Sequence, residues 1–262
     1  MRLWKKKLPS REDKQMSEAD KIETGVFDRK TMMLLYGFLN KGIISSVDYP
    51  ISTGKEADVF RATTGPKFEK QGAYTAVKIF RIETANFIHM QDYLFNDPRF
   101  QHVRRNKRRI IDAWCQKEFK NLLLCKEAKV PAPMPFVFEK NVLLMEFIGE
   151  EGVPDSTLKQ IGSEAPEKDC DTLLGYIRKL YRKGLVHSDL SEFNILMHGY
   201  PDAVPYLIDV GQGVLLGHPM ADEFLRRDIM NVLRYFKGYG VKRDADEILE
   251  WVKASRAPSS KA

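Results

Sequence analysis

The spacing of apolar and polar residues changes along the chain, and the changes predict different kinds of structure. Residues 1–21 are polar and charged, and they are predicted to form a polar N-terminal segment. Residues 21–42 have apolar positions at nearly helical spacing, and Gly42 follows as a helix stop. Residues 47–60 and 73–80 are short runs rich in Val, Ile, Tyr and Phe, which is typical of strands. This part therefore predicts one helix followed by a small sheet.

The middle of the chain predicts a loop, a long helix and two further strands. Residues 84–109 are polar, aromatic and basic, and Pro98 interrupts them, so we expect a flexible basic loop there. Residues 110–128 are amphipathic and contain neither Gly nor Pro, which predicts a helix. Residues 136–148 indicate two strands joined by a turn at 139–141.

The pattern becomes helical after Gly149. Helices are expected over residues 169–183, 221–235 and 245–254. Strands first and helices later predict an α+β protein with two lobes. The sheet-rich N-lobe covers residues 22–148 and the helical C-lobe covers residues 149–262. The cleft between such lobes is where a nucleotide would bind.

Composition indicates a globular protein. Apolar residues make up 43% and charged residues 30% of the 262 positions. No apolar run reaches the roughly 18 residues of a membrane span, and the basic N-terminus lacks the apolar stretch of a secretory signal. The three cysteines, Cys115, Cys125 and Cys170, are widely spaced, which fits neither a disulfide framework nor a zinc site. We expect reduced thiols, a cytoplasmic location and no membrane partner.

Basic residues are concentrated in one segment of a chain whose formal net charge is +6. Residues 99–109, which we call the basic block, contain His102, no acidic residue and six cationic side chains: Arg99, Arg104, Arg105, Lys107, Arg108 and Arg109. A block of this kind favours a polyanion, above all nucleic acid. A solvated helix face would show the same run of charge, and that alternative stays open.

The segment 186–196, VHSDLSEFNIL, carries the strongest chemical signal. Asn194 follows Asp189 at a spacing of five, and Asp209 comes after a later apolar run. Asp189 is the candidate catalytic base that orients a phosphoryl acceptor, and Asn194 and Asp209 offer hard oxygen ligands for Mg²⁺ or Mn²⁺. His187 is predicted to pack beneath this loop in a structural role.

Two segments of the N-lobe complete a candidate phosphate site. Residues 51–60, which we call the flap, hold one glycine in a turn, and the flap backbone with Ser52 and Lys55 could meet phosphates. A hairpin turn without a ligand is the alternative. Lys78 alternates with apolar residues on a strand and could enter the cleft, where a buried ammonium needs an anion such as Glu118. Taken alone, Lys78 could equally be an exposed strand residue.

Residues 142–149 predict a buried strand that leads into a linker. The Glu146 carbonyl and the Ile148 N–H could bind the edge of adenine, and Met145 would face the back of the pocket. An ordinary core strand is the alternative.

Three of these segments, STGKEADVF, HSDLSEFNIL and LIDVGQGV, resemble the motifs of the RIO family of atypical serine/threonine protein kinases. The resemblance covers roughly residues 22–255 and favours the type-1 branch in an archaeal-like minimal form, because the short N-terminal region leaves little room for the winged helix of type 2. It implies a two-lobed protein-kinase-like fold with a minimal C-lobe that lacks the activation segment and the peptide-binding subdomains. Val-Gly-Gln after Asp209 agrees with that reading.

The same resemblance implies functions for individual residues. ATP with Mg²⁺ or Mn²⁺ would bind through Lys78 and its partner Glu118, and Asp209 would be both a metal ligand and the acceptor in an aspartyl-phosphate intermediate. Small ribosomal subunit maturation would make precursor subunits and rRNA the partners of the basic block. Family members of this branch can phosphorylate their own serine between the Lys strand and the Glu helix, where this chain offers only Thr84 besides a tyrosine.

Two other functions remain open at this stage. Small-molecule phosphotransferases also carry HxDxxxxN followed by an Asp, but they usually have a larger C-lobe. A non-catalytic RNA- or ribosome-binding module is the other alternative, and the complete set of Lys78, Asp189, Asn194 and Asp209 argues against it.

Overall fold

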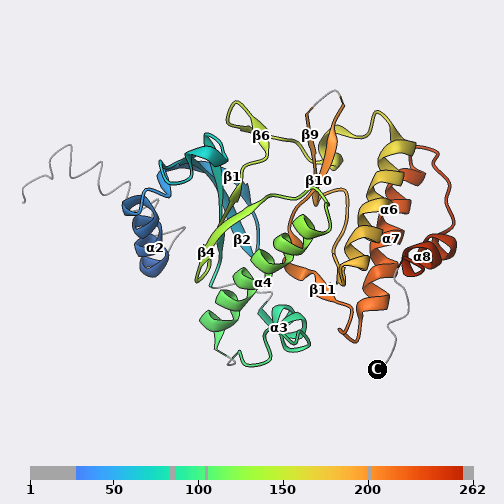
Figure 1. Cartoon of the computed structure of the whole chain (residues 1–262), viewed down its shortest axis with the longest axis horizontal. Helices are drawn as coiled ribbons and strands as arrows, with labels where there is room; N and C mark the ends of the chain where they lie inside the picture. Colours follow the sequence, from blue (N-terminus) through green and yellow to red (C-terminus); the bar gives the residue numbers. More distant parts are fainter. Residues whose placement is uncertain (1–27, 83–86, 104–105, 200–201, 256–262) are drawn as a thin grey trace, which may run out of the picture.

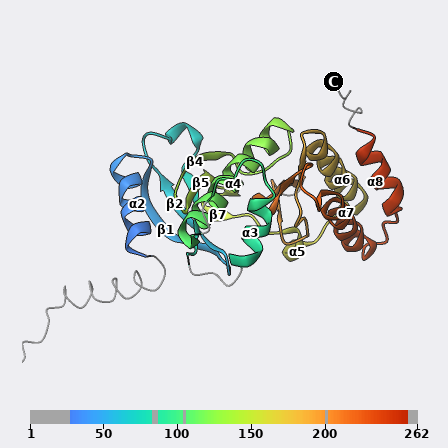
Figure 2. The same cartoon turned by 90° about the horizontal axis from the view of Figure 1, so that it is seen from below.

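Two lobes lie side by side in the structure, a computed structural model that describes residues 28–82, 87–103, 106–199 and 202–255. Figure 2 shows the sheet-containing lobe with α2 at one end of the molecule and the helical lobe with α8 at the other. The expected polar segment 1–21, Thr84, Arg104 and Arg105 lie outside the described residues.

The N-lobe is built on one antiparallel sheet of five strands in the order β1-β2-β3-β5-β4. Its strands are β1 (Ile44–Thr53), β2 (Ala57–Thr64), β3 (Tyr74–Phe80), β4 (Pro135–Glu139) and β5 (Val142–Glu146). Its helices are α2 (Arg29–Asn40), the short η1 (Glu69–Gln71), α3 (Phe87–Phe95) and α4 (Lys107–Glu127). The strands and the two helices expected in this lobe are therefore present, with α4 starting slightly earlier than predicted.

Each face of the sheet has its own hydrophobic core. Val77 and Ile79 of β3 belong to a small core under α2, whereas Ala76 and Phe80 belong to the large core that contains α4 and extends into the C-lobe. Successive side chains of a strand point to opposite faces, so Lys78 points to the α4 side. This alternation brings the lysine to the space between the lobes, where α4 also lies (Figure 1).

The C-lobe is mainly helical. Its helices are α5 (Leu158–Ile161), α6 (Pro166–Arg182), the short η2 (Val210–Gln212), α7 (Ala221–Lys237) and α8 (Ala245–Lys253). Short strands β6 (Gly149–Glu150), β7 (Val153–Pro154), β8 (Leu185–Val186), β9 (Ile195–His198), β10 (Val204–Leu207) and β11 (Val214–Leu215) form two-stranded pairs. The three helices expected after Gly149 correspond to α6, α7 and α8.

The expectation of a flexible loop over residues 84–109 was wrong in its central part. Helix α3 occupies part of this segment, and Met90, Leu94 and Phe100 are buried in the large core. These apolar positions pack into the core that α4 shares, whereas Asp92 and Asn96 are exposed. The polar and basic residues around Pro98 led the sequence pattern to a loop over the whole segment.

Two other expectations from composition can be compared with the structure. Cys115, Cys125 and Cys170 are free, buried thiols, as predicted. Among the described residues, no helix is both long enough and apolar enough to cross a bilayer.

Candidate active site

A pocket of about 550 Å³ is lined by residues of both lobes. The N-lobe contributes the flap, β3 and the end of β5, and the C-lobe contributes β9 and the segment around Asp209. The pocket brings together most of the residues predicted from the sequence: Ser52, Lys55, Lys78, Met145, Glu146, Ile148, Asn194 and Asp209. Glu118 and Asp189 stand behind this lining, and each is hydrogen-bonded to a lining residue.

Lys78 is held by carboxylates from two different elements. Its Nζ donates to both carboxylate oxygens of Glu118, at 2.7 and 2.8 Å, and to Oδ1 of Asp209 at 2.8 Å. The strand lysine thus meets the helix glutamate as the sequence predicted. An ammonium group has three N–H donors, so these three bonds occupy all of them. A phosphate oxygen can bind Lys78 only by replacing one of these acceptors.

Burial and charge act on this cluster in opposite directions. Burial alone would lower the pKa of Lys78, but the negative charges of Asp209 and Glu118 raise that pKa above its ordinary value. The charge of Lys78 in turn lowers the pKa of Asp209, which is therefore ionised at neutral pH. The Asp209 side chain is 50% exposed. An ionised and accessible carboxylate is suited both to bind a cation and to act as a nucleophile.

The backbone of Asp209 is unusual. It has φ 59° and ψ 51°, which is the left-handed region that residues other than Gly seldom adopt. Asp is one of the residues that tolerate this region, but the conformation still has to be stabilised by its surroundings. We call the residues that follow, 210–213, the metal loop.

Asp189 and Asn194 are joined across the loop that precedes β9. The Asn194 side-chain nitrogen donates to the backbone carbonyl of Asp189 at 2.8 Å, and Gln212 Nε2 donates to Asp189 Oδ2 at 3.1 Å. Burial, reinforced by the charge of Asp209, raises the pKa of Asp189 to about 6. Because Asn194 uses its nitrogen on Asp189, its Oδ1 is the atom that can face a cation.

A buried carboxylate on α7 accepts hydrogen bonds from the backbone of the loop that contains Asp189. Asp228 Oδ2 accepts from the backbone N–H of Ser188 at 2.8 Å, and its Oδ1 accepts from that of Leu190 at 2.9 Å. These bonds fix the backbone on both sides of Asp189. Sequence reasoning missed Asp228, although an acidic residue in the buried stripe of an amphipathic helix was a usable signal.

His187 has the structural position that was predicted for it. Its ring is buried, and its Nε2 lies 3.3 Å from the carbonyl oxygen of Ile208. Burial lowers the pKa of His187 to about 4, so the ring is neutral and supports the segment that ends at Asp209.

The far end of the pocket is formed by β5 and the linker after it. Met145 is buried and lines the pocket, while the Glu146 N–H donates to the carbonyl of Met134 at 2.8 Å. The carboxylate of Glu146 also accepts from the Met134 N–H at 3.0 Å, and the Ile148 carbonyl accepts from Asp155 at 3.1 Å. These bonds fix the linker backbone beside the pocket.

The flap is a tight hairpin above the pocket. The N–H of Gly54 donates to the carbonyl of Ala57 at 3.0 Å, and a Cβ at Gly54 would lie only 3.1 Å from that oxygen. Ser52 and Lys55 are exposed on the flap and line the pocket. This geometry is compatible with both interpretations drawn from the sequence, a flap that binds phosphate and a hairpin turn without a ligand.

The oxygen donors of this pocket suit a divalent cation that is only partly coordinated by protein side chains. Among the described residues, no group of three or more His, Cys, Asp or Glu side chains could form a metal cage. Asn194 and Asp209 both line the pocket and would supply two oxygen ligands. Mg²⁺ is commonly bound by one or two such side chains together with substrate phosphates and water, so the pair suits a cation that arrives with a nucleotide.

The basic block is less free than its sequence indicated. Arg99 is paired with Asp97 and donates to Asn121 at 2.9 Å, and Arg108 is paired with Asp28. Acidic residues that are distant in the sequence, or just outside the block, therefore offset part of its charge.

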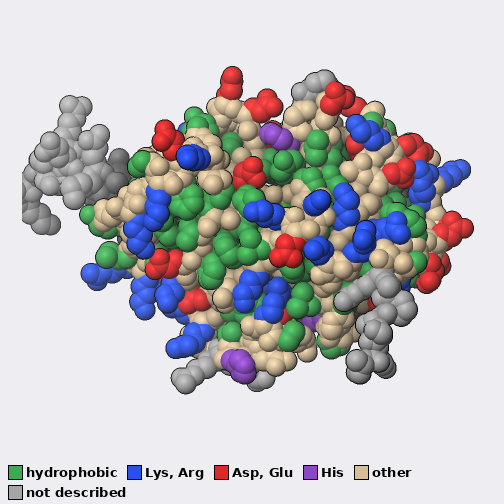
Figure 3. Space-filling model, in the orientation of Figure 1, with side chains coloured by type: hydrophobic (Ala, Val, Ile, Leu, Met, Phe, Trp, Pro, Cys, Tyr) green, Lys and Arg blue, Asp and Glu red, His purple; other side chains and the backbone are tan. Residues whose placement is uncertain are grey.

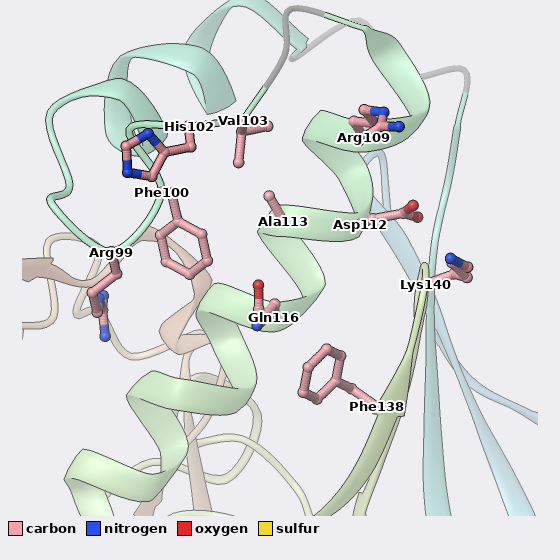
Figure 4. A pocket seen from close by; sticks show the side chains of 10 residues that line it. All are labelled: Arg99, Phe100, His102, Val103, Arg109, Asp112, Ala113, Gln116, Phe138 and Lys140. Atoms are coloured by element: carbon pink, nitrogen blue, oxygen red, sulfur yellow. The ribbon is translucent and has the colours of Figure 1, made fainter.

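The described part of the block borders a hollow of about 390 Å³ (Figure 4). Figure 4 shows Arg109 and Lys140 at one end and Arg99 and His102 at the other, with Phe100, Ala113 and Gln116 between them. This hollow is separate from the pocket that holds Asp209, because the two share no lining residue.

A second basic surface lies elsewhere on the protein. Lys and Arg side chains are scattered over the whole face drawn in Figure 3. A hollow between the ends of α4 and α6 is lined by Lys129, Lys179, Arg182 and Lys183 together with Glu127. The described part of the chain therefore has a second cationic surface that is distinct from the basic block.

Comparison with known proteins agrees with this architecture. Residues 58–248 match the model of the RIO domain. The chain is 41% identical over 240 residues to the RIO-type serine/threonine-protein kinase Rio1 of Haloferax volcanii, covering 91% of this chain and 80% of that protein. It is 38% identical over 221 residues to human serine/threonine-protein kinase RIO1, covering 82% of this chain and 38% of that protein.

The fold is also shared with a solved structure. The Rio2 kinase–ADP/Mg²⁺–phosphoaspartate complex from Chaetomium thermophilum superposes with a TM-score of 0.65 at 21% identity. The match covers 86% of this chain and 66% of that one. The predicted α+β, protein-kinase-like fold is confirmed.

Proposed function

This chain belongs to the RIO family of serine/threonine protein kinases, and from that premise we propose that its pocket binds ATP with Mg²⁺ or Mn²⁺ and uses Asp209 as a phosphoryl acceptor. The observation that carries the proposal is the joining of Lys78 to both Glu118 and Asp209 at one end of a pocket. The relatives are RIO1-type protein kinases, which favours this function over a small-molecule phosphotransferase or a non-catalytic module.

The nucleotide would lie between the flap and the C-lobe. Adenine would meet the backbone of Glu146 and Ile148 with Met145 behind it, and the phosphates would lie under the flap near Ser52 and Lys55. Lys78 would bind phosphate oxygens while Glu118 keeps its ammonium in place. Because all three N–H groups of Lys78 are occupied, phosphate binding would displace Asp209 from the lysine and free it.

Asn194 and Asp209 would hold the divalent cation. When bound, the cation would neutralise charge on the phosphates and so lower the barrier for phosphoryl transfer. Asp189, fixed by Asn194 and Gln212, would orient the group that receives the phosphoryl. Its raised pKa places it near neutrality, where a general base is most effective.

The proposed reaction has two steps at Asp209. A carboxylate oxygen of Asp209 attacks the γ-phosphorus, and the bond from that phosphorus to the β–γ bridging oxygen breaks with its electron pair leaving on ADP. Water then attacks the same phosphorus, loses a proton to a base such as Asp189, and releases inorganic phosphate from the carboxylate. A covalent intermediate of this kind divides one difficult step into two easier ones. The solved Rio2 complex with phosphoaspartate supports this proposal for a related kinase.

The cycle would act as a switch on small ribosomal subunit precursors. ATP binding would favour the bound state, and hydrolysis through Asp209 would promote release. The basic block would contact rRNA through the cationic residues that remain exposed, such as Lys107 and Arg109. Autophosphorylation at Thr84 also remains a proposal, since Thr84 lies outside the described residues.

The experiment compares metal-dependent ATP hydrolysis and nucleotide binding in wild type and Asp209→Asn. The variant should lose turnover, because an amide is a poor nucleophile and a weaker cation ligand, but it should still bind ATP through Lys78 and the linker. Asp202→Asn, at an exposed position outside the pocket, is the matched control and should behave as wild type. Turnover by Asp209→Asn close to that of wild type would contradict the proposal.

A further inference from the structure

Lys117 is a fully buried lysine whose ammonium bonds to backbone instead of to a carboxylate. Its Nζ donates to the carbonyl of Gly211 at 2.6 Å and also to that of Gly213. No ion pair of Lys117 is found within the described ranges. Burying an ammonium group is costly, so its position calls for a reason.

The neighbouring residue one helical turn later reinforces the same contact. Asn121 Nδ2 donates to the carbonyl of Val210 at 2.8 Å and to that of Gly213 at 2.9 Å. Together, Lys117 and Asn121 bind three carbonyls of the metal loop from one face of α4. Arg99 donates to Asn121 Oδ1 at 2.9 Å, which fixes the amide with its nitrogen toward the loop.

From these contacts we propose that Lys117 and Asn121 are positioning residues that hold the metal loop and thereby set the Asp209 carboxylate in the pocket. The inference rests on the proposed role of Asp209. The backbone of Asp209 is in the left-handed region, and the four hydrogen bonds from α4 fall on the residues immediately after it. They therefore stabilise a conformation that the residue seldom adopts on its own.

The glycines of the metal loop provide an independent observation. A Cβ at Gly211 would lie 3.2 Å from Glu118 Oε2 and 3.2 Å from Trp114 Nε1. A Cβ at Gly213 would lie 3.0 Å from Asn121 Nδ2. Both glycines have negative φ, so they are explained by close approach to α4 rather than by backbone conformation. The loop is built to lie against the helix.

Two aromatic rings lie near the Lys117 ammonium, which has no carboxylate partner among the described residues. The Lys117 ammonium lies 5.2 Å from the ring centre of Trp114 and 5.7 Å from that of Tyr93 on α3. A cation near the face of such rings is stabilised, more strongly when it is away from water. Helix α3, which the sequence did not predict, thus helps to enclose the lysine that holds the metal loop.

The test uses Lys117→Met, which keeps the length and apolar stem of the side chain but removes its donors. We expect kcat for ATP hydrolysis to fall about tenfold to a hundredfold, because small displacements of a reacting group have effects of this size. KM for ATP should change by less than about threefold, since the loop lies apart from the adenine end. Amide hydrogen exchange over residues 210–214 should become faster in the nucleotide-free protein while the rest of the C-lobe keeps its protection.

Controls separate positioning from folding and from the proposed function. Lys126→Met changes an exposed lysine of the same helix and should match wild type in all three measurements. If Lys117→Met does not fold, Asn121→Leu removes the other half of the contact and should show the same local change. Wild-type kcat and exchange in these variants, or a uniform loss of protection across the C-lobe, would overturn the inference. Wild type without metal-dependent turnover would instead overturn the proposed function, and the exchange measurement would still test the contact.

Discussion

Helix α4 carries two adjacent buried charged residues that fix opposite sides of the pocket by different means. Glu118 faces the N-lobe, where its carboxylate meets the ammonium of Lys78 on β3. Lys117 faces the C-lobe, where its ammonium donates hydrogen bonds to backbone carbonyls of the metal loop. One contact is between opposite charges, and the other is between a charge and dipoles.

The difference shows in the two lysines. The charges of Asp209 and Glu118 outweigh burial and raise the pKa of Lys78, whereas burial lowers the pKa of Lys117 to about 7. Lys78 therefore keeps its positive charge at neutral pH, and phosphate binding requires that charge. A neutral Lys117 would still have two N–H groups, enough for both of its carbonyl acceptors. The contact of Lys78 is suited to binding phosphate, and the contact of Lys117 is suited to holding the metal loop in place.

The largest expected effect comes from removing the charged contact at Lys78. Lys78→Met should lower kcat/KM for ATP about a hundredfold to a thousandfold, because it removes a fixed donor to the phosphates in a site partly shielded from water. Steady-state kinetics of this variant and of Lys41→Met, an exposed lysine on the other side of the sheet, provide the measurement. A loss at Lys78 no greater than at Lys41 would show that the ion pair has only a structural function.

Stability should also separate the two lysines, with the larger loss again at Lys78. Lys78→Met leaves Glu118 buried without its partner and should cost about 3 kcal/mol of unfolding free energy. Lys117→Met leaves no uncompensated charge, but it leaves the buried carbonyl of Gly211 without its side-chain donor, so it should cost less, about 1 kcal/mol. Urea unfolding of both variants at neutral pH makes the comparison. The double variant Lys78→Met with Glu118→Leu should recover most of the loss, and its failure to do so would point to packing rather than charge.

These contacts also show what the sequence could and could not reveal. Lys78, Asp189, Asn194 and Asp209 were found because fixed spacings and alternation along strands are local properties of the chain. Lys117 was not, because its acceptors are more than ninety residues away. Its position in the buried stripe of α4, next to Glu118, was the available signal, since lysine is rarely buried without a reason.

The same limit explains the segment before α4. The apolar residues of α3 stand within a longer segment that is polar, basic and interrupted by Pro98, and this composition indicated a loop. The packing of α3 against α4 is a tertiary contact that no local pattern shows. The predicted freedom of the basic block failed for a related reason. Asp28, which pairs with Arg108, is eighty positions away, so the run of charge looked unopposed.

A smaller effect is expected from pH. Burial raises the pKa of Asp189 to about 6, so the residue should lose its charge, and the enzyme its activity, as the pH falls through that value. Stability has the opposite sign at this residue: the folded state holds the proton more tightly than the unfolded state, so ionisation between about pH 4 and 6 disfavours folding. A kcat/KM profile with a midpoint near 6, in a range where thermal unfolding shows the protein folded, would agree. A flat profile would remove Asp189 from the role of base.

The smallest expected effect lies at the exposed start of α4. Lys107→Gln with Arg109→Gln should weaken RNA binding severalfold and reduce the slope of affinity against salt concentration by about one per lost phosphate contact. ATP hydrolysis without RNA should not change, because both side chains lie outside the pocket. Neutralising Lys179, Arg182 and Lys183 gives the comparison. A larger loss there would assign the RNA contact to the second basic surface.

The central claim is that Asp209, released from Lys78 by the nucleotide, accepts the phosphoryl group. The most direct measurement is the chemistry of the label left on the protein after brief incubation with γ-labelled ATP and denaturation. We predict a label that hydroxylamine removes, that maps to Asp209 and that is absent in Asp209→Asn. A label that resists hydroxylamine and is stable in acid would contradict the claim.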